Sequence, residues 1–148
     1  MGGNYLNSIL ATQDAKQRGF DEAILLDQSG DVSEAPGENI FLVKNNELIT
    51  PPLTSSALNG ITRKSIITIA KDMGFKTKVR KVSKKELKLA DEIFLSGTAA
   101  EITPVIQIDK KRIKASKVGN ITKLLMTAYS NIVMNKNKKY SQWLTRVY

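Results

Sequence analysis

The sequence predicts a single mixed α/β (α+β) domain, with strands and helices interspersed along the chain. Short apolar runs closed by Gly, Pro, Asn or Asp alternate with longer stretches whose apolar residues recur at helical spacing. The 148 residues, of which 41% are hydrophobic and 25% charged, are enough for one hydrophobic core. No internal repeat, low-complexity tract or linker divides the chain, so we expect the strands and helices to share one domain.

The first 50 residues predict a helix followed by short strands. Gly19 can end a helix over residues 4–18, whose apolar stripe is expected to be Tyr5, Leu6, Ile9 and Leu10. Apolar runs bounded by turn residues predict strands that pair with one another over residues 22–27, 40–43 and 47–50.

Glu34 lies among these strands, and two interpretations of its carboxylate stay open. One is a solvated strand face, which is the ordinary place of a glutamate. The other is a buried position, where a carboxylate is costly unless a cation or a strong donor meets it. The second interpretation requires a cationic partner, such as a ligand.

The middle of the chain predicts a loop, a helix and a basic strand. Residues 50–56 contain two prolines and predict an irregular loop. A helix is expected to open with residues 59–64 and to end at Gly74. Residues 75–82 then predict a strand with alternating cations, a pattern typical of an exposed sheet edge.

The C-terminal part predicts a short helix, two strands, a long helix and a packed tail. The capping box Ser83–Glu86 opens the short helix. Strands are expected over residues 91–96 and 101–109, with turns at 97–100 and 110–111. The long helix spans residues 121–134, with an expected inward face of Leu124, Leu125, Ala128, Ile132 and Val133. In the tail, the residues expected to pack back onto the domain are Trp143 and Leu144.

Composition excludes several classes of chemistry. The chain has no Cys and no His, which rules out disulfides, thiolate nucleophiles, Ser-His-Asp catalysis and most zinc or iron sites. The net charge of +9 favours an anionic partner. The densest basic stretch, residues 76–88, nearly lacks aromatics and contains no nucleic-acid motif, so a solvated face is the better interpretation. No signal peptide or membrane span is evident, and we expect a cytoplasmic protein.

Two short stretches are suited to holding an anion. Gly60-Ile61-Thr62 stands at a predicted helix start, where free backbone N–H groups carry partial positive charge. Residues 96–99 end a predicted strand in a turn of small residues, whose amides can form an anion-binding nest. Taken singly, these are equally an ordinary capped helix and a tight connection. Together with Glu34 they describe a pocket for a phosphorylated cofactor with a protonated ring nitrogen.

A series of motifs resembles the branched-chain amino-acid aminotransferases, which are class IV, fold-type IV enzymes dependent on pyridoxal 5′-phosphate (PLP). The motifs are GGNYL at residues 2–6, EAPGENIF at 34–41, TPP at 50–52, GITR at 60–63, ADE at 90–92 and SGTAAEITPV at 96–105. The resemblance covers nearly the whole chain and implies the large C-terminal domain, residues 1–148, without the small N-terminal domain. It also implies mixed β-sheets that form a pseudo-barrel core with surrounding helices.

The resemblance implies a role for each matching residue. Glu34 would pair with the protonated pyridine nitrogen, and the Tyr5 hydroxyl would lie near the phenolic oxygen of PLP. The phosphate would be bound at the first loop by Ile61 and Thr62, and at the second by Gly97 and Thr98. The amides of Thr98 and Ala99 would receive the substrate carboxylate.

One departure concerns the Schiff-base lysine of the family, which would fall immediately before Met1. The resemblance therefore implies that no catalytic residue lies in this chain and that the chain alone does not transaminate. The complete enzyme would exchange an amino group between leucine, isoleucine or valine and 2-oxoglutarate, as a homodimer.

Three alternatives stay open. D-amino-acid transaminase and aminodeoxychorismate lyase share the fold. A non-catalytic cofactor-binding or assembly module is the alternative of a different class.

Overall fold

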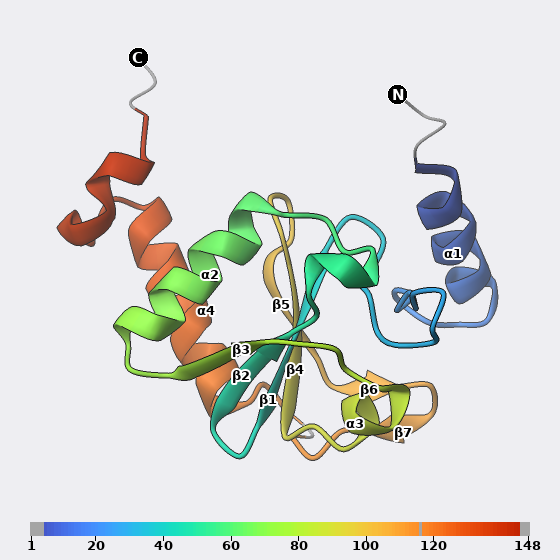
Figure 1. The fold of residues 1–148 in the computed structure, drawn as a ribbon. Helices are drawn as coiled ribbons and strands as arrows, with labels where there is room; N and C mark the ends of the chain where they lie inside the picture. The colour runs from blue at the N-terminus through green and yellow to red at the C-terminus, as the bar shows by residue number, and fades with distance from the viewer. Residues whose placement is uncertain (1–4, 116, 146–148) are drawn as a thin grey trace.

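In the computed structural model, which describes residues 5–115 and 117–145, a five-stranded mixed sheet forms the centre of the molecule. Its strands are β1 (Asn39–Lys44), β2 (Glu47–Thr50), β3 (Lys76–Val79), β4 (Glu92–Gly97) and β5 (Glu101–Val105), in the order β3-β2-β1-β4-β5 (Figure 1). Strands β2 and β3 run parallel, and the other neighbours run antiparallel. The mixed α/β fold class is thereby confirmed.

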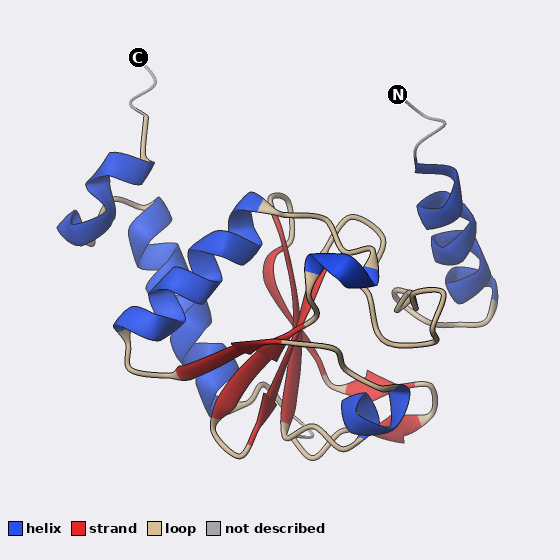
Figure 2. Cartoon of the chain, viewed as in Figure 1, coloured by secondary structure: helices blue, strands red, loops and turns tan. Residues whose placement is uncertain are grey.

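Helices and a small second sheet flank this sheet. The helices are α1 (Leu6–Gln17), α2 (Ile61–Asp72), α3 (Lys84–Lys88) and α4 (Asn120–Val133), with 3-10 turns η2 (Leu53–Ser55) and η3 (Lys138–Trp143). The second sheet pairs β6 (Gln107–Ile108) with β7 (Lys111–Arg112). Figure 2 shows α2 and α4 together on one flank, α3 and the β6–β7 sheet on the other, and α1 apart at the edge of the molecule.

Strand alternation sends successive residues of β1 into two separate cores. Phe41 packs on the α2 and α4 side, where its ring stacks on that of Phe94 at 4.9 Å between centroids. Ile40 and Leu42 belong to the second core, together with residues from α3 and from the segment before β1. Because β1 is buried on both faces, its position is fixed by both cores, and so is the turn that leads into it.

The turns predicted from Gly and Asn lie where expected. Asn45 and Asn46 both adopt positive φ, at 50° and 61°, and join β1 to β2 as a tight hairpin. Gly19 and Gly74 follow α1 and α2 with φ near +80°, a conformation in which a side chain would be strained.

Residues 22–27 do not form the predicted strand. They lie alongside residues 31–35, but the pairing consists of one bridge, Leu26 with Val32, of hydrogen bonds between Leu25 and residues 33–34, and of one from the Asp27 amide to the Asp31 carbonyl. The ladder is irregular because the Leu25 amide donates to the Glu34 carbonyl, at 2.7 Å, and not to that of Ser33, whose own amide donates to Leu25. On its other side, the segment is joined to residue 82 by the hydrogen bond from the Val32 amide to the Val82 carbonyl, at 2.8 Å.

Two further strand boundaries differ from expectation. The basic edge strand ends at Val79, and Val82 beyond it is fully buried in the second core. The strand predicted over residues 101–109 is broken at Ile106 into β5 and β6, and its turn falls at residues 109–110, where Asp109 has a φ of 53°.

Several apolar side chains predicted to be inward are exposed. In α4, Leu125 and Ile132 are buried, whereas Leu124 and Val133, which flank this buried stripe on its two sides, are about half exposed. In the tail, Tyr140 is the buried anchor and Trp143 packs on its ring, at 4.6 Å between centroids. The apolar stripe of α1 is also exposed, through Tyr5, Leu6, Ile9 and Leu10.

Within the described residues, no helix combines the length and apolar character that crossing a membrane requires.

The rotation of α4 about its own axis, which decides which of its side chains are buried, is set by a buried carboxylate at its N-terminus. Glu92 on β4 accepts hydrogen bonds from the amides of Ile121, at 3.1 Å, and Thr122, at 2.8 Å, and from the Thr122 hydroxyl. Gly119, the N-cap residue, lies directly against the Glu92 side chain, so a Cβ there would overlap the carboxylate. A helix start with an anion seated on its amides is strongly anchored.

Gly119→Ala is therefore expected to destabilise the chain by about 3 kcal/mol, because it would displace a buried, hydrogen-bonded carboxylate. The backbone at Gly119 (φ −69°, ψ 158°) accommodates alanine, so the cost arises from the overlap alone. Denaturant unfolding measures the change, and Lys123→Ala, at an exposed position of the same helix, is the control. A loss below about 1 kcal/mol would contradict this account of the Glu92 cap.

Candidate functional site

The candidate site begins at Glu34, which precedes a tight turn into β1. The turn is closed by two hydrogen bonds between Ala35 and Glu38, and Gly37 within it has a φ of +79°. The half-buried Glu34 carboxylate accepts hydrogen bonds on one oxygen, Oε2, from the Leu58 amide at 2.7 Å and from Asn39 Nδ2 at 3.1 Å. Burial raises the pKa of Glu34, and the Leu58 amide opposes that rise.

Asn39, the first residue of β1, joins Glu34 to the start of α2. Its Nδ2 group also donates to the Leu58 carbonyl at 2.8 Å. Its Oδ1 atom lies against Gly60, so closely that a Cβ at Gly60 would overlap it. Gly60 is the N-cap residue of α2, and Asn39 is buried. The carboxylate of Glu34 and the first turn of α2 therefore share one rigid neighbour.

The N-terminus of α2 has no acidic cap, in contrast to that of α4. Within the described chain, no side chain caps its first amides, and its first turn contains no acidic residue. The side chain of Ile61 is 81% exposed, whereas that of Thr62 is buried. Free amides at a helix start attract an anion, and here the described chain supplies none.

A buried cation follows directly in the same helix. Arg63 is 5% exposed and donates from Nη2 to the Pro51 carbonyl at 2.9 Å, while its Nε has no hydrogen-bond partner among the described residues. Burial lowers the pKa of Arg63. Across the part of the chain that the structure describes, neither Arg63 nor Glu34 takes part in an ion pair, so neither charge is neutralised in that way.

The second predicted anion-binding stretch lies against the turn before β1. A Cβ on Gly97 would be 3.1 Å from the Gly37 carbonyl oxygen and 3.3 Å from Glu38 Cγ, so only glycine fits there without displacement. Ser96 pairs with Asn39 across the sheet, which places both side chains on one face. Its hydroxyl is buried and has no partner among the described residues.

The structure thus brings Glu34, the start of α2 and Gly97 together around one turn. Thr98 and Ala99 continue from Gly97 as an exposed turn. Tyr5 stands at the N-cap of α1, 54% exposed, and no hydrogen bond in the described chain joins its side chain to the others. Sequence reasoning assigned no role to Asn39 or Arg63. Asn39 stands directly before the apolar run 40–43, whereas Arg63 stands in the polar stretch 62–65, and neither place in the sequence indicates burial.

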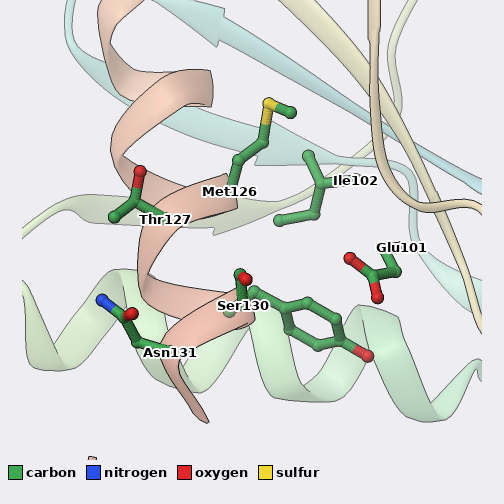
Figure 3. A pocket seen from close by; sticks show the side chains of 7 residues that line it. Glu101, Ile102, Met126, Thr127, Ser130 and Asn131 are labelled. Carbon is green, nitrogen blue, oxygen red and sulfur yellow. The ribbon is translucent and has the colours of Figure 1, made fainter. Parts of the chain in front are cut away.

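Three cavities of the described chain lie away from these residues. One of about 360 Å³ opens between α4 and the start of β5, and Figure 3 shows Met126 and Ser130 on the helix with Ile102 and Glu101 across from them. Glu101 itself has a φ of 51°, in the left-handed region that favours glycine. Two further cavities, of about 940 and 550 Å³, are likewise lined by residues other than Glu34, Thr62 and Thr98.

This arrangement suits a ligand that is cationic at one end and anionic at the other. Glu34 presents an anchored carboxylate to the cationic end. The uncapped α2 amides, with Arg63 behind them and the Gly97 turn beside them, present donors to the anionic end.

Comparison with known proteins identifies the family. Residues 2–108 match the family model described as Amino-transferase class IV. A probable branched-chain-amino-acid aminotransferase of Aquifex aeolicus (strain VF5) is 46% identical over 149 residues, which cover 100% of this chain and 48% of that protein.

Two solved structures share the fold. The branched-chain aminotransferase of Thermoproteus uzoniensis, solved with norvaline, has a TM-score of 0.95 and 48% identity, over 99% of this chain and 48% of that one. The branched-chain amino acid aminotransferase of Thermobaculum terrenum, solved in its PLP-form, has a TM-score of 0.94 and 41% identity, over 97% of this chain and 47% of that one. The chain spans about half the length of these relatives, and it belongs to the class IV aminotransferase family.

Proposed function

We propose that this chain is the cofactor-binding large domain of a PLP-dependent branched-chain aminotransferase. The observation that carries the proposal is the half-buried Glu34 carboxylate, anchored beside a helix start that has no anion of its own in the described chain. The family and the PLP-form of the Thermobaculum terrenum relative support PLP as the group with matching charges.

The residues present fit this cofactor. A protonated pyridine nitrogen opposite Glu34 would supply the counter-charge that the carboxylate lacks. A phosphate at the amides of Ile61 and Thr62 would satisfy the start of α2, as Glu92 satisfies that of α4. Gly97 and Thr98 would complete the phosphate site, where the Ser96 hydroxyl, unpartnered among the described residues, is a further donor.

Each residue of the candidate site has a definite task in this proposal. PLP, when bound, supplies an electron sink for the carbanion formed as a substrate loses its Cα proton. Glu34 would keep the ring nitrogen protonated, the two loops would hold the phosphate, and Tyr5 would lie near the phenolic oxygen. The amides of Thr98 and Ala99 receive the substrate carboxylate, which orients the Cα–H bond.

The activity of the whole protein is part of the proposal. We propose amino-group exchange between leucine, isoleucine or valine and 2-oxoglutarate, since the relatives reported above are all named as branched-chain aminotransferases. The other requirements, a Schiff-base lysine and a small domain outside residues 1–148, are proposed from the same resemblance. A homodimer and a cytoplasmic location stay predictions.

Binding of PLP to the 148-residue chain tests the proposal. We expect a saturable complex in calorimetry, weaker for pyridoxal, which lacks the phosphate. Glu34→Gln keeps the hydrogen-bond acceptor but removes the charge, so it should weaken PLP binding about tenfold or more. Asp21→Asn, at an exposed position, is the control. Equal affinities for PLP and pyridoxal, or an unchanged affinity in Glu34→Gln, would contradict the proposal.

The cofactor-free chain should show the cost of the Glu34 charge in its stability. Because the pKa of Glu34 is raised, the folded chain holds this proton to a higher pH than the unfolded chain, whose value is about 4.5. Its contribution to stability is therefore present below pH 4.5 and lost as pH rises through the raised folded pKa. Relative to Glu34→Gln, the wild type should lose free energy of unfolding between about pH 4 and pH 7. Denaturant titrations at both pH values measure this, and a constant difference would refute it.

Gly97→Ala should distort the second proposed phosphate-binding loop, at Gly97 and Thr98. The added Cβ would press on the Gly37 carbonyl at 3.1 Å, and either the turn or the loop must shift. We expect PLP affinity to fall by about tenfold, with a smaller effect on pyridoxal, because the loop is proposed to hold the phosphate. An equal loss for both ligands, measured by calorimetry, would place Gly97 outside the phosphate site.

A further inference from the structure

We infer that Asn39 is a positioning residue that locks the ring-nitrogen carboxylate and the phosphate-binding helix start into one fixed arrangement. The inference rests on the proposed function and adds to it a residue that touches neither end of the cofactor. Because of Asn39, binding of the ring nitrogen by Glu34 and binding of the phosphate by the start of α2 depend on each other.

At the carboxylate, Asn39 fixes one oxygen and leaves the other free. Glu34 Oε2 accepts from Asn39 Nδ2 at 3.1 Å and from the Leu58 amide at 2.7 Å. No hydrogen bond within the described chain falls on Oε1. Two donors on a single oxygen restrain rotation of the carboxylate plane, so Oε1 is held ready for a cationic N–H group.

At the helix start, the same carboxamide acts through its other atoms. Nδ2 donates its second hydrogen to the Leu58 carbonyl at 2.8 Å, and Oδ1 occupies the space that a side chain at position 60 would take. A carboxamide is planar and rigid, and this one belongs to a residue that is 5% exposed. Its orientation toward Glu34 therefore also sets the position of Gly60 and of the first amides of α2.

The main chain of Asn39 reaches the second loop. Asn39 begins β1 and pairs with Ser96, the residue before Gly97. A shift of Asn39 would thus move the carboxylate, the helix start and the Gly97 turn together. A residue that only supports the fold would lower stability and weaken every ligand equally, whereas a positioning residue changes which parts of the ligand are recognised.

The test measures two preferences in the 148-residue chain by calorimetry. The ring preference is the affinity for PLP over the analogue with CH in place of the ring nitrogen. The phosphate preference is the affinity for PLP over pyridoxal. We expect Asn39→Ala to lower both preferences about tenfold, and Asn59→Ala, at an exposed neighbouring position, to leave both within about twofold.

Gly60→Ala perturbs the same contact from the opposite side. Its φ of −64° and ψ of 144° accommodate alanine, but its Cβ would overlap Asn39 Oδ1. It should also lower both preferences, and adding it to Asn39→Ala should cause less than about a twofold further change, because the overlapping atom is gone. If Asn39→Ala does not fold, Gly60→Ala alone decides the question.

The outcomes separate the two claims. A wild-type chain with neither preference would overturn the proposed function and, with it, the role of Asn39. A wild-type chain with both preferences, together with an Asn39→Ala or Gly60→Ala variant that keeps them, would overturn the role of Asn39 alone. Losses that multiply in the double variant would likewise contradict a shared contact.

Discussion

The structure depends on how a half-buried carboxylate is held without an ion pair among the described residues. Glu34 is kept in place by one backbone amide, that of Leu58, and one side-chain amide, that of Asn39. Hydrogen bonds of this kind stabilise the ionised form but leave its net charge in place. A site built in this way keeps a negative charge that can bind a cation. A salt bridge within the chain would have neutralised that charge.

Two helix starts of this fold, those of α4 and α2, are electrostatically opposite. At α4, Glu92 seats its carboxylate on the helix amides, and the helix start is complete. At α2, the equivalent amides have no acid from the described chain, and buried Arg63 adds a positive charge close behind them. The comparison within one molecule shows that the open end of α2 is a property of that sequence and not of helix starts in general.

Local chemistry made much of the fold predictable. Asn45–Asn46, Gly19 and Gly74 fix turns by their backbone conformations, and the Ser83 side chain caps α3 as its capping box requires. In a full capping box the Glu86 side chain would also accept from the Ser83 amide, but here it accepts from Arg80. The loops at Gly60 and Gly97 were also evident, because small residues at element ends have few structural alternatives.

What escaped prediction is set by partners distant in sequence. The face that α4 presents depends on Glu92, so that Leu124 and Val133 fall at the two edges of the buried stripe and stay half exposed. Residues 22–27 do not form a strand because their pairing is irregular, with the Leu25 amide bound to Glu34 and not to Ser33. The role of Asn39 depends on Leu58 and Gly60, and no local pattern reveals either contact.

The pairing of Asn39 with Ser96 also bears on how the chain folds. The hairpin of β1 with β2 closes over a short loop, but β1 meets β4 only after α2, β3 and α3 have been traversed. Such non-local pairings form late, because their loop-closure entropy must be overcome first. Cofactor affinity would consequently arise in the last stages of folding, and a partly folded chain, lacking the completed sheet, would be left unliganded.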